Sequence, residues 1–123
     1  MPIEQQVCSP ELAKRLNELG EHQESYFYWV SWGGDSFDLM DRTAMINELN
    51  HDEEKYSAFT DAELGESLKA FGASTEYILD PEYEAYYCYV DGMAPTADQT
   101  EANARAKMRV AILEKSKICL LKT

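Results

Sequence analysis

Apolar residues recur at helical spacing in three stretches of this chain, over residues 9–20, 60–72 and 97–121. The first two stretches open with residue types that cap helices, Ser9 and Thr60, and both end at a glycine. These are the usual boundary signals of an α-helix. The spacing therefore predicts three amphipathic helices, spread along the whole chain.

Four stretches between these helices are interpreted as strands, at 25–32, 36–40, 76–79 and 83–90, and the first and last are rich in aromatic residues. The links within each pair are of hairpin length, which favours antiparallel pairing. A further short helix is predicted over 42–49. The order α-β-β-(α)-α-β-β-α indicates an α+β fold with a largely antiparallel sheet. Because the strands are aromatic on both faces, we expect helices on both faces of the sheet, an α/β/α sandwich.

The last helical stretch carries the strongest pattern. Asp98 and Glu101 have the spacing of a capping box, and Thr100 is a second N-cap type. A helical wheel at about 100° per residue gives two apolar arcs. One arc holds Ala104, Met108, Ala111 and Ile112, and the other holds Ala102, Ala106, Val110 and Leu113.

Arg105 and Arg109 fall between the two apolar arcs of this helix. Two interpretations stay open at this point. The arginines either pair with carboxylates at the edge of the core, or they face an anionic ligand or a second subunit. Planar guanidinium groups suit the second role because they bind phosphate and carboxylate through two parallel hydrogen bonds.

Charge is unevenly distributed over the 123 residues. The net charge is −12, with +3 on residues 98–123 and −15 on residues 1–97. Such a field repels duplex nucleic acid and anionic membranes, so neither is an expected partner. A small anion could still be held by the C-terminal arginines. The acidity could instead serve a basic protein partner.

The length predicts a single domain covering residues 1–123. The cysteines, at positions 8, 88 and 119, are odd in number and far apart, which favours a reducing compartment. No secretory signal precedes Cys8, and no apolar run is long enough to cross a membrane. We therefore expect a cytoplasmic protein.

Catalytic and metal-binding motifs are missing from the sequence. It contains no nucleophile elbow, phosphate loop, dinucleotide fingerprint or zinc motif, so an enzyme is not expected. The run 51–54 (His-Asp-Glu-Glu) is interpreted as a solvated charge run, and Asp35, Asp38 and Asp41 lack the spacing of a calcium loop. Cys88, within a tyrosine-rich strand, is interpreted as a small buried residue. We expect no metal and no cofactor.

Several aromatic residues could stack on a nucleotide base, among them Trp29, Trp32 and Tyr87. The alternative is that most of them belong to the core. Trp32, next to Gly33-Gly34 at the end of a predicted strand, is the best placed to reach solvent.

Three segments carry a resemblance to known proteins: 7–16 (VCSPELAKRL), 58–66 (AFTDAELGE) and 100–108 (TEANARAKM). They look like a group of small uncharacterised proteins of phages and mobile elements. The last segment is also similar to the phage ABA-sandwich domain, a family that includes the Thoeris anti-defence sponges. That resemblance implies an oligomeric, non-enzymatic protein that sequesters a cyclic nucleotide immune signal in the host cytoplasm, with Arg105 and Arg109 reaching its phosphate.

Two functional hypotheses follow. In the first, the chain is a homo-oligomeric nucleotide sponge that uses Arg105 and Arg109 for phosphate and Trp29, Trp32 or Tyr87 for stacking. In the second, it is an acidic protein-interaction inhibitor that presents the surface of residues 1–97 to a basic host protein. The sequence leaves both open.

Overall fold

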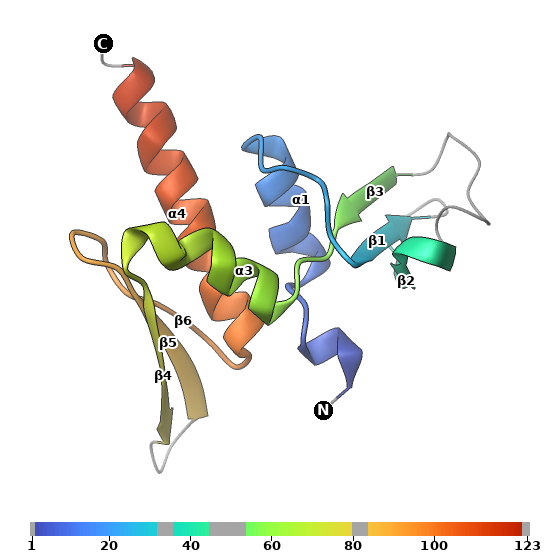
Figure 1. Ribbon diagram of the computed structural model, residues 1–123, viewed down its shortest axis with the longest axis horizontal. Helices are drawn as coiled ribbons and strands as arrows, with labels where there is room; N and C mark the ends of the chain where they lie inside the picture. Colours follow the sequence, from blue (N-terminus) through green and yellow to red (C-terminus); the bar gives the residue numbers. More distant parts are fainter. Residues whose placement is uncertain (1, 32–35, 45–53, 80–83, 122–123) are drawn as a thin grey trace.

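The computed structural model of this protein describes residues 2–31, 36–44, 54–79 and 84–121. Its helices include α1 (Pro10–Glu18), α3 (Asp61–Leu68) and α4 (Glu101–Leu121), which Figure 1 labels, and the 3-10 helices η1 (Ile3–Gln5) and η2 (Lys69–Phe71). Its strands are β1 (Phe27–Ser31), β2 (Phe37–Asp41), β3 (Glu54–Ser57), β4 (Ser74–Leu79), β5 (Glu84–Tyr89) and β6 (Thr96–Asp98). The predicted α+β class and the main order of elements are confirmed.

The described strands form two antiparallel sheets of three strands each. The first has the order β2-β1-β3, and the second has the order β4-β5-β6. The hairpins β1-β2 and β4-β5 correspond to the two predicted strand pairs. The strands β3 and β6 were not predicted, and each lies at the edge of its sheet.

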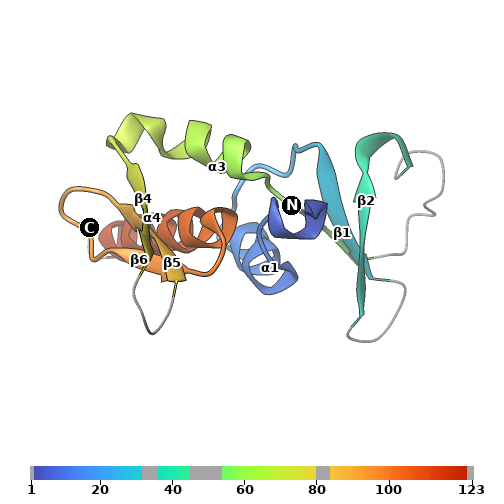
Figure 2. The same ribbon diagram turned by 90° about the horizontal axis from the view of Figure 1, so that it is seen from below.

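The layers are arranged differently from the predicted sandwich. Along the longest axis of the molecule, the sheet β4-β5-β6 comes first, the helices follow, and the sheet β2-β1-β3 comes last (Figures 1 and 2). The prediction of one sheet with helices on both faces therefore needs correction: the helices lie between two sheets. The physical reason is that α4 has two apolar faces: one packs against the sheet β4-β5-β6, and the other packs against α1, which contacts β3 of the other sheet.

The two apolar arcs of α4 indeed enter two different clusters of the core. One arc, with Ala102 and Ala106 buried and Val110 and Leu113 partly buried, packs with Leu16 of α1, Trp29 of β1 and Phe59. The other arc contributes Ala104, Met108 and Ile112, which pack with Leu68 of α3, Cys88 of β5 and Val90. Residues of α4 thus belong to both clusters. Its alanines allow this close approach on both sides.

The helix boundaries follow the expected local signals, with one exception. The Ser9 hydroxyl caps α1, and Thr60 and Glu63 form the predicted capping box of α3. The predicted box of Asp98 and Glu101 is wrong. Asp98 pairs with Tyr86 as part of β6, so its backbone is extended, and the hydroxyl of Thr100 instead accepts a hydrogen bond from the Asn103 amide at 3.2 Å.

Some predicted elements lie outside the described residues. Of the helix predicted over 42–49, residues 42–44 are helical and the rest is not described. Within the charge run 51–54, only Glu54 is described, and it begins β3. Trp32 and Asp35 also lie outside the described residues.

Candidate functional site

Arg105 lies at the junction of α3, α4 and β4. Its guanidinium is 3.0 Å from the carboxylate of Asp61 and 2.8 Å from that of Glu101. Nη1 also donates to the carbonyl oxygen of Asp61 at 2.9 Å, and Nε donates to the hydroxyl of Thr75 at 3.0 Å. The side chain is 22% exposed. Arg105 therefore ties three elements together, and most of its donors are engaged.

Asp61 is the unusual carboxyl group of this junction. Burial raises its pKa to about 6, nearby Glu101 acts in the same direction, and Arg105 opposes the rise. A cavity of about 370 Å³ lies beside it, lined in part by Thr60, Asp61, Tyr86 and Glu101. The carboxylates of Asp61 and Glu101 share the guanidinium of Arg105. This arrangement holds α3 and α4 together without any ligand.

Arg109 makes the second long-range ion pair of α4. Its Nε donates to Oε2 of Glu21, and its Nη2 donates to Oε1 of the same carboxylate at 3.3 Å. The two side chains are 17% and 14% exposed. Of the two interpretations open for the arginines, the structure shows pairing with carboxylates. A phosphate at either position would have to displace a carboxylate from a partly buried guanidinium.

The aromatic candidates are not gathered around the arginines. Trp29 is buried in the cluster between α1 and the first sheet, and its Nε1 donates to the carbonyl oxygen of Cys8 at 2.8 Å. Tyr87 lies on the second sheet, with its ring stacked on that of Tyr89 at 6.3 Å. Because Thr75 pairs with Cys88, the neighbour of Tyr87, Tyr87 faces the side of the sheet opposite to Arg105. Trp32 lies outside the described residues.

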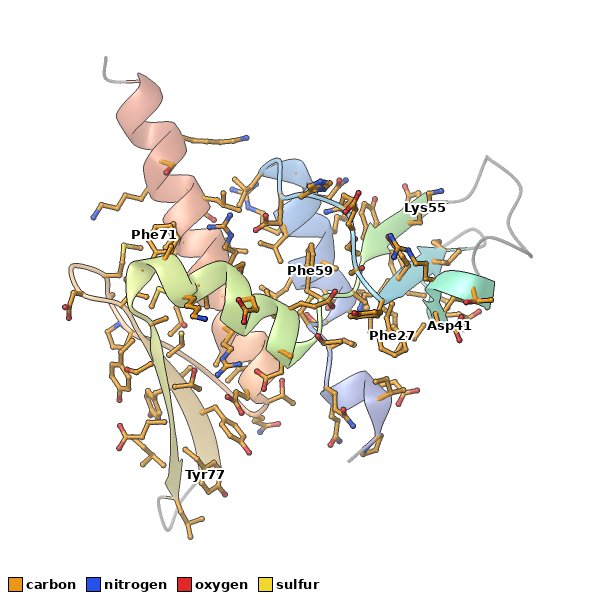
Figure 3. The ribbon with its side chains drawn as sticks, viewed as in Figure 1. Phe27, Asp41, Lys55, Phe59, Phe71 and Tyr77 are labelled. Atoms are coloured by element: carbon orange, nitrogen blue, oxygen red, sulfur yellow. The ribbon has the colours of Figure 1, made fainter. Side chains whose placement is uncertain are left out.

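A different site forms where α3 meets the segment after α1, and we call it the α3 pocket. Its volume is about 360 Å³. It is lined by Glu21, His22, Glu24, Phe59, Glu63, Leu64, Glu66 and Ser67. Figure 3 shows Phe59 between α1 and α3, where it packs with Leu16 and Leu64 in the core. The pocket therefore combines an apolar floor with carboxylates from two segments.

Two of these carboxylates are engaged within the protein. Glu63 accepts from the amide of Thr60 at 2.8 Å and from the amide of Tyr26 at 3.3 Å. Glu21 holds Arg109. Both side chains are thereby fixed in orientation, and the rim of the pocket is preorganised.

The other two carboxylates remain available for a ligand. Glu24 is 71% exposed and lies 4.0 Å from Nε2 of His22, a contact that has ionic character only when the histidine is protonated. Glu66 makes no salt bridge with any described residue. A cation that enters the pocket would therefore meet two carboxylates without a strong competing partner.

The sequence contains little signal for this pocket. Glu63 and Glu66 are three apart on a helix, so they share a face. Nothing in the spacing of Glu21 and Glu24, some 40 residues earlier, links them to that face. The pocket arises because the chain leaves α1 and passes over α3 before β1 begins.

Among the described residues, no group of three or more His, Cys, Asp or Glu side chains converges on a position for a metal ion. No described helix is long and apolar enough to span a bilayer. Comparisons with protein-family models, with curated proteins and with solved structures returned no match.

Proposed function

We propose that this protein is an acidic binding module that takes a lysine or arginine side chain of a basic partner protein into the α3 pocket. The observation that carries the proposal is the lining of the pocket, in which Glu24 and Glu66 flank the buried floor of Phe59 and Leu64. A long basic side chain has both parts that such a site recognises. Its methylene stem packs on apolar surface while its charged end reaches carboxylates.

The charge of the whole chain supports the same class of partner. The net charge is −12, and both arginines on the central helix are internally paired. The field around the molecule is therefore negative and speeds the approach of a basic protein. This proposal develops the second of the two sequence hypotheses.

The proposal is tested with a fluorescent peptide that contains arginines, compared with the same peptide in which citrulline replaces each arginine. Citrulline keeps the shape of the side chain and lacks its charge. The full chain should bind the arginine peptide more tightly, and the affinity should fall as salt rises. Equal affinity for the two peptides would contradict the proposal.

A pair of double variants tests the position of the site. Glu24→Gln with Glu66→Gln should raise the dissociation constant about tenfold, because two exposed charge pairs contribute about 0.7 kcal/mol each. The matched control is Glu4→Gln with Glu11→Gln, which removes the same charge from exposed positions elsewhere. If both double variants weaken binding equally, the peptide binds to the general acidic field and the pocket has no part in it.

The nucleotide-sequestering hypothesis stays a prediction, and a separate thermal-shift panel tests it. Cyclic dinucleotides, cyclic trinucleotides and cyclic ADP-ribose isomers serve as the probes. A ligand at about 100 times its dissociation constant stabilises the fold by about 2.7 kcal/mol. A clear shift with one of these anions would favour the first hypothesis over the acidic module.

A further inference from the structure

The strand β4 is an open edge with apolar side chains along it. In the described chain it lies at one end of the sheet β4-β5-β6, and its six residues pair with β5 without a bulge. Tyr77, Ile78 and Leu79 are 47%, 37% and 68% exposed. Figure 3 shows Tyr77 on the part of the hairpin that points away from α3. An exposed edge of this length is a template for another strand.

Most natural edge strands are protected against such pairing by lysine, proline, a bulge or a very short length. Residues 74–79 contain no lysine, no proline and no bulge. They form one of the two longest strands among the described residues. Their only charge is Glu76. On a molecule that is otherwise strongly acidic, this edge is poor in charge and is a weak target for a basic partner.

We propose that β4 pairs antiparallel with β4 of a second copy of this chain, which joins two three-stranded sheets into one sheet of six strands across a two-fold axis. In an antiparallel pair, residues directly opposite each other point to the same face of the sheet. When both strands are copies of β4 related by a two-fold axis perpendicular to the sheet, this condition places the axis between the two copies of one residue. A centre on Glu76 places two carboxylates directly opposite each other, which is unfavourable. A centre on Tyr77 avoids this contact.

The register centred on Tyr77 places no like charges opposite each other within the strand. It places Glu76 opposite Ile78 of the second copy and Thr75 opposite Leu79 of the second copy. Tyr77 already contacts Tyr86, with ring centroids 4.9 Å apart. With the two Tyr77 side chains opposite each other, four tyrosine rings form a continuous row on one face of the sheet. Aromatic cross-strand pairs of this kind stabilise antiparallel sheets.

The dependence on salt concentration distinguishes this interface from the binding of a basic partner. Two copies, each with a net charge of −12, repel each other at long range, and salt screens that repulsion. Dimer formation through β4 therefore strengthens as salt rises, whereas binding of a basic peptide weakens. Each proposal can fail without the other.

The experiment is sedimentation velocity on the full chain, from micromolar to near-millimolar concentration, at about 0.05 M and about 0.5 M salt. We expect a monomer–dimer equilibrium that shifts toward the dimer at the higher salt. Tyr77→Lys and Tyr77→Glu should each raise the dimer dissociation constant by at least about tenfold, because each places like charges opposite each other at the axis. A one-to-one mixture of the two variants should restore the dimer as a heterodimer, detected by native mass spectrometry.

The matched control is Tyr26→Lys, which makes the same chemical change at a tyrosine that is 67% exposed and lies just before β1. It should dimerise as the unmodified chain does. If Tyr77→Lys fails to fold by circular dichroism, Ile78→Glu replaces it, because the register places that carboxylate opposite Glu76 of the second copy. A chain that stays monomeric throughout, or a mixture that does not form the heterodimer, would overturn the proposal.

Discussion

The guanidinium of Arg109 and the carboxylate of Glu21 form an ion pair that joins α4 to the segment after α1, 88 residues earlier in the sequence. Both side chains are mostly buried, and two nitrogen atoms of the guanidinium donate to the two oxygens of the carboxylate. Glu21 also lines the α3 pocket. The pair therefore connects the central helix to the wall of the proposed binding site.

Replacement of Arg109 should destabilise the fold. Arg109→Met should lower the free energy of unfolding by about 2 kcal/mol, because it leaves the carboxylate of Glu21 mostly buried without a cation. Urea unfolding followed by circular dichroism measures the loss. The control is Arg15→Met, whose side chain is 45% exposed where it approaches Glu114, and which should cost about 0.5 kcal/mol or less. The nucleotide hypothesis makes the contrary prediction that Arg109→Ala leaves the fold intact and removes ligand binding only.

Asp61 should give the stability a specific dependence on pH. Its pKa rises from 3.8 to about 6 on folding, so the folded protein holds the proton more tightly than the unfolded chain does. The resulting stabilisation is fully present below pH 3.8 and is lost as the pH rises through 6. Asp61→Asn cannot ionise, so the variant should gain stability relative to the unmodified chain between pH 4 and pH 7.

The expected gain at pH 7 is about 1 kcal/mol, a value reduced for solvent screening because the Asp61 side chain is 34% exposed. Thermal unfolding in a series of buffers from pH 4 to pH 7.5 measures it. Asp91→Asn, in an exposed turn, reports the effect of removing one negative charge alone. If the difference in stability between Asp61→Asn and the unmodified chain is the same at every pH in this range, the raised pKa of Asp61 is contradicted.

The buried cysteines should resist alkylation in the folded protein. Burial raises the pKa of Cys8 to about 12 and also raises the pKa of Cys88, so neither thiol is ionised at pH 8. After brief treatment with iodoacetamide, peptide mass spectrometry should find both unmodified. In urea, both should react fully. Rapid modification of Cys88 in the folded chain would contradict its interpretation as a buried core residue.

The local structure could be predicted from the sequence because its signals lie within a few residues of one another. Ser9 and Thr60 cap helices as expected. The helical wheel of residues 97–121 predicts that Met108 and Ala106 lie on different apolar arcs. In the structure these two side chains belong to the two different clusters. The position of Arg105 and Arg109 between the arcs likewise corresponds to side chains that are only partly buried.

The long-range arrangement could not be predicted because it depends on pairings that leave no local pattern. Asp61 is 44 residues from Arg105, and any of the 23 acidic residues could have been its partner. β3 begins at Glu54 within an apparent charge run, since an edge strand can present polar residues to solvent. The α3 pocket likewise depends on the path that the chain takes after α1.

Gly65 of α3 lies close to the guanidinium of Arg105. A Cβ atom at this position would lie 2.8 Å from Nη1 of Arg105, which donates to the carbonyl oxygen of Asp61. Gly65→Ala should therefore displace the guanidinium and lower the free energy of unfolding by about 1 kcal/mol, despite the higher helix propensity of alanine. In an Arg105→Ala background the obstruction is gone, and the same substitution should raise stability by about 0.5–1 kcal/mol. Urea unfolding of the four chains measures both effects, and the same sign in both backgrounds would show that Gly65 and Arg105 do not interact in this way.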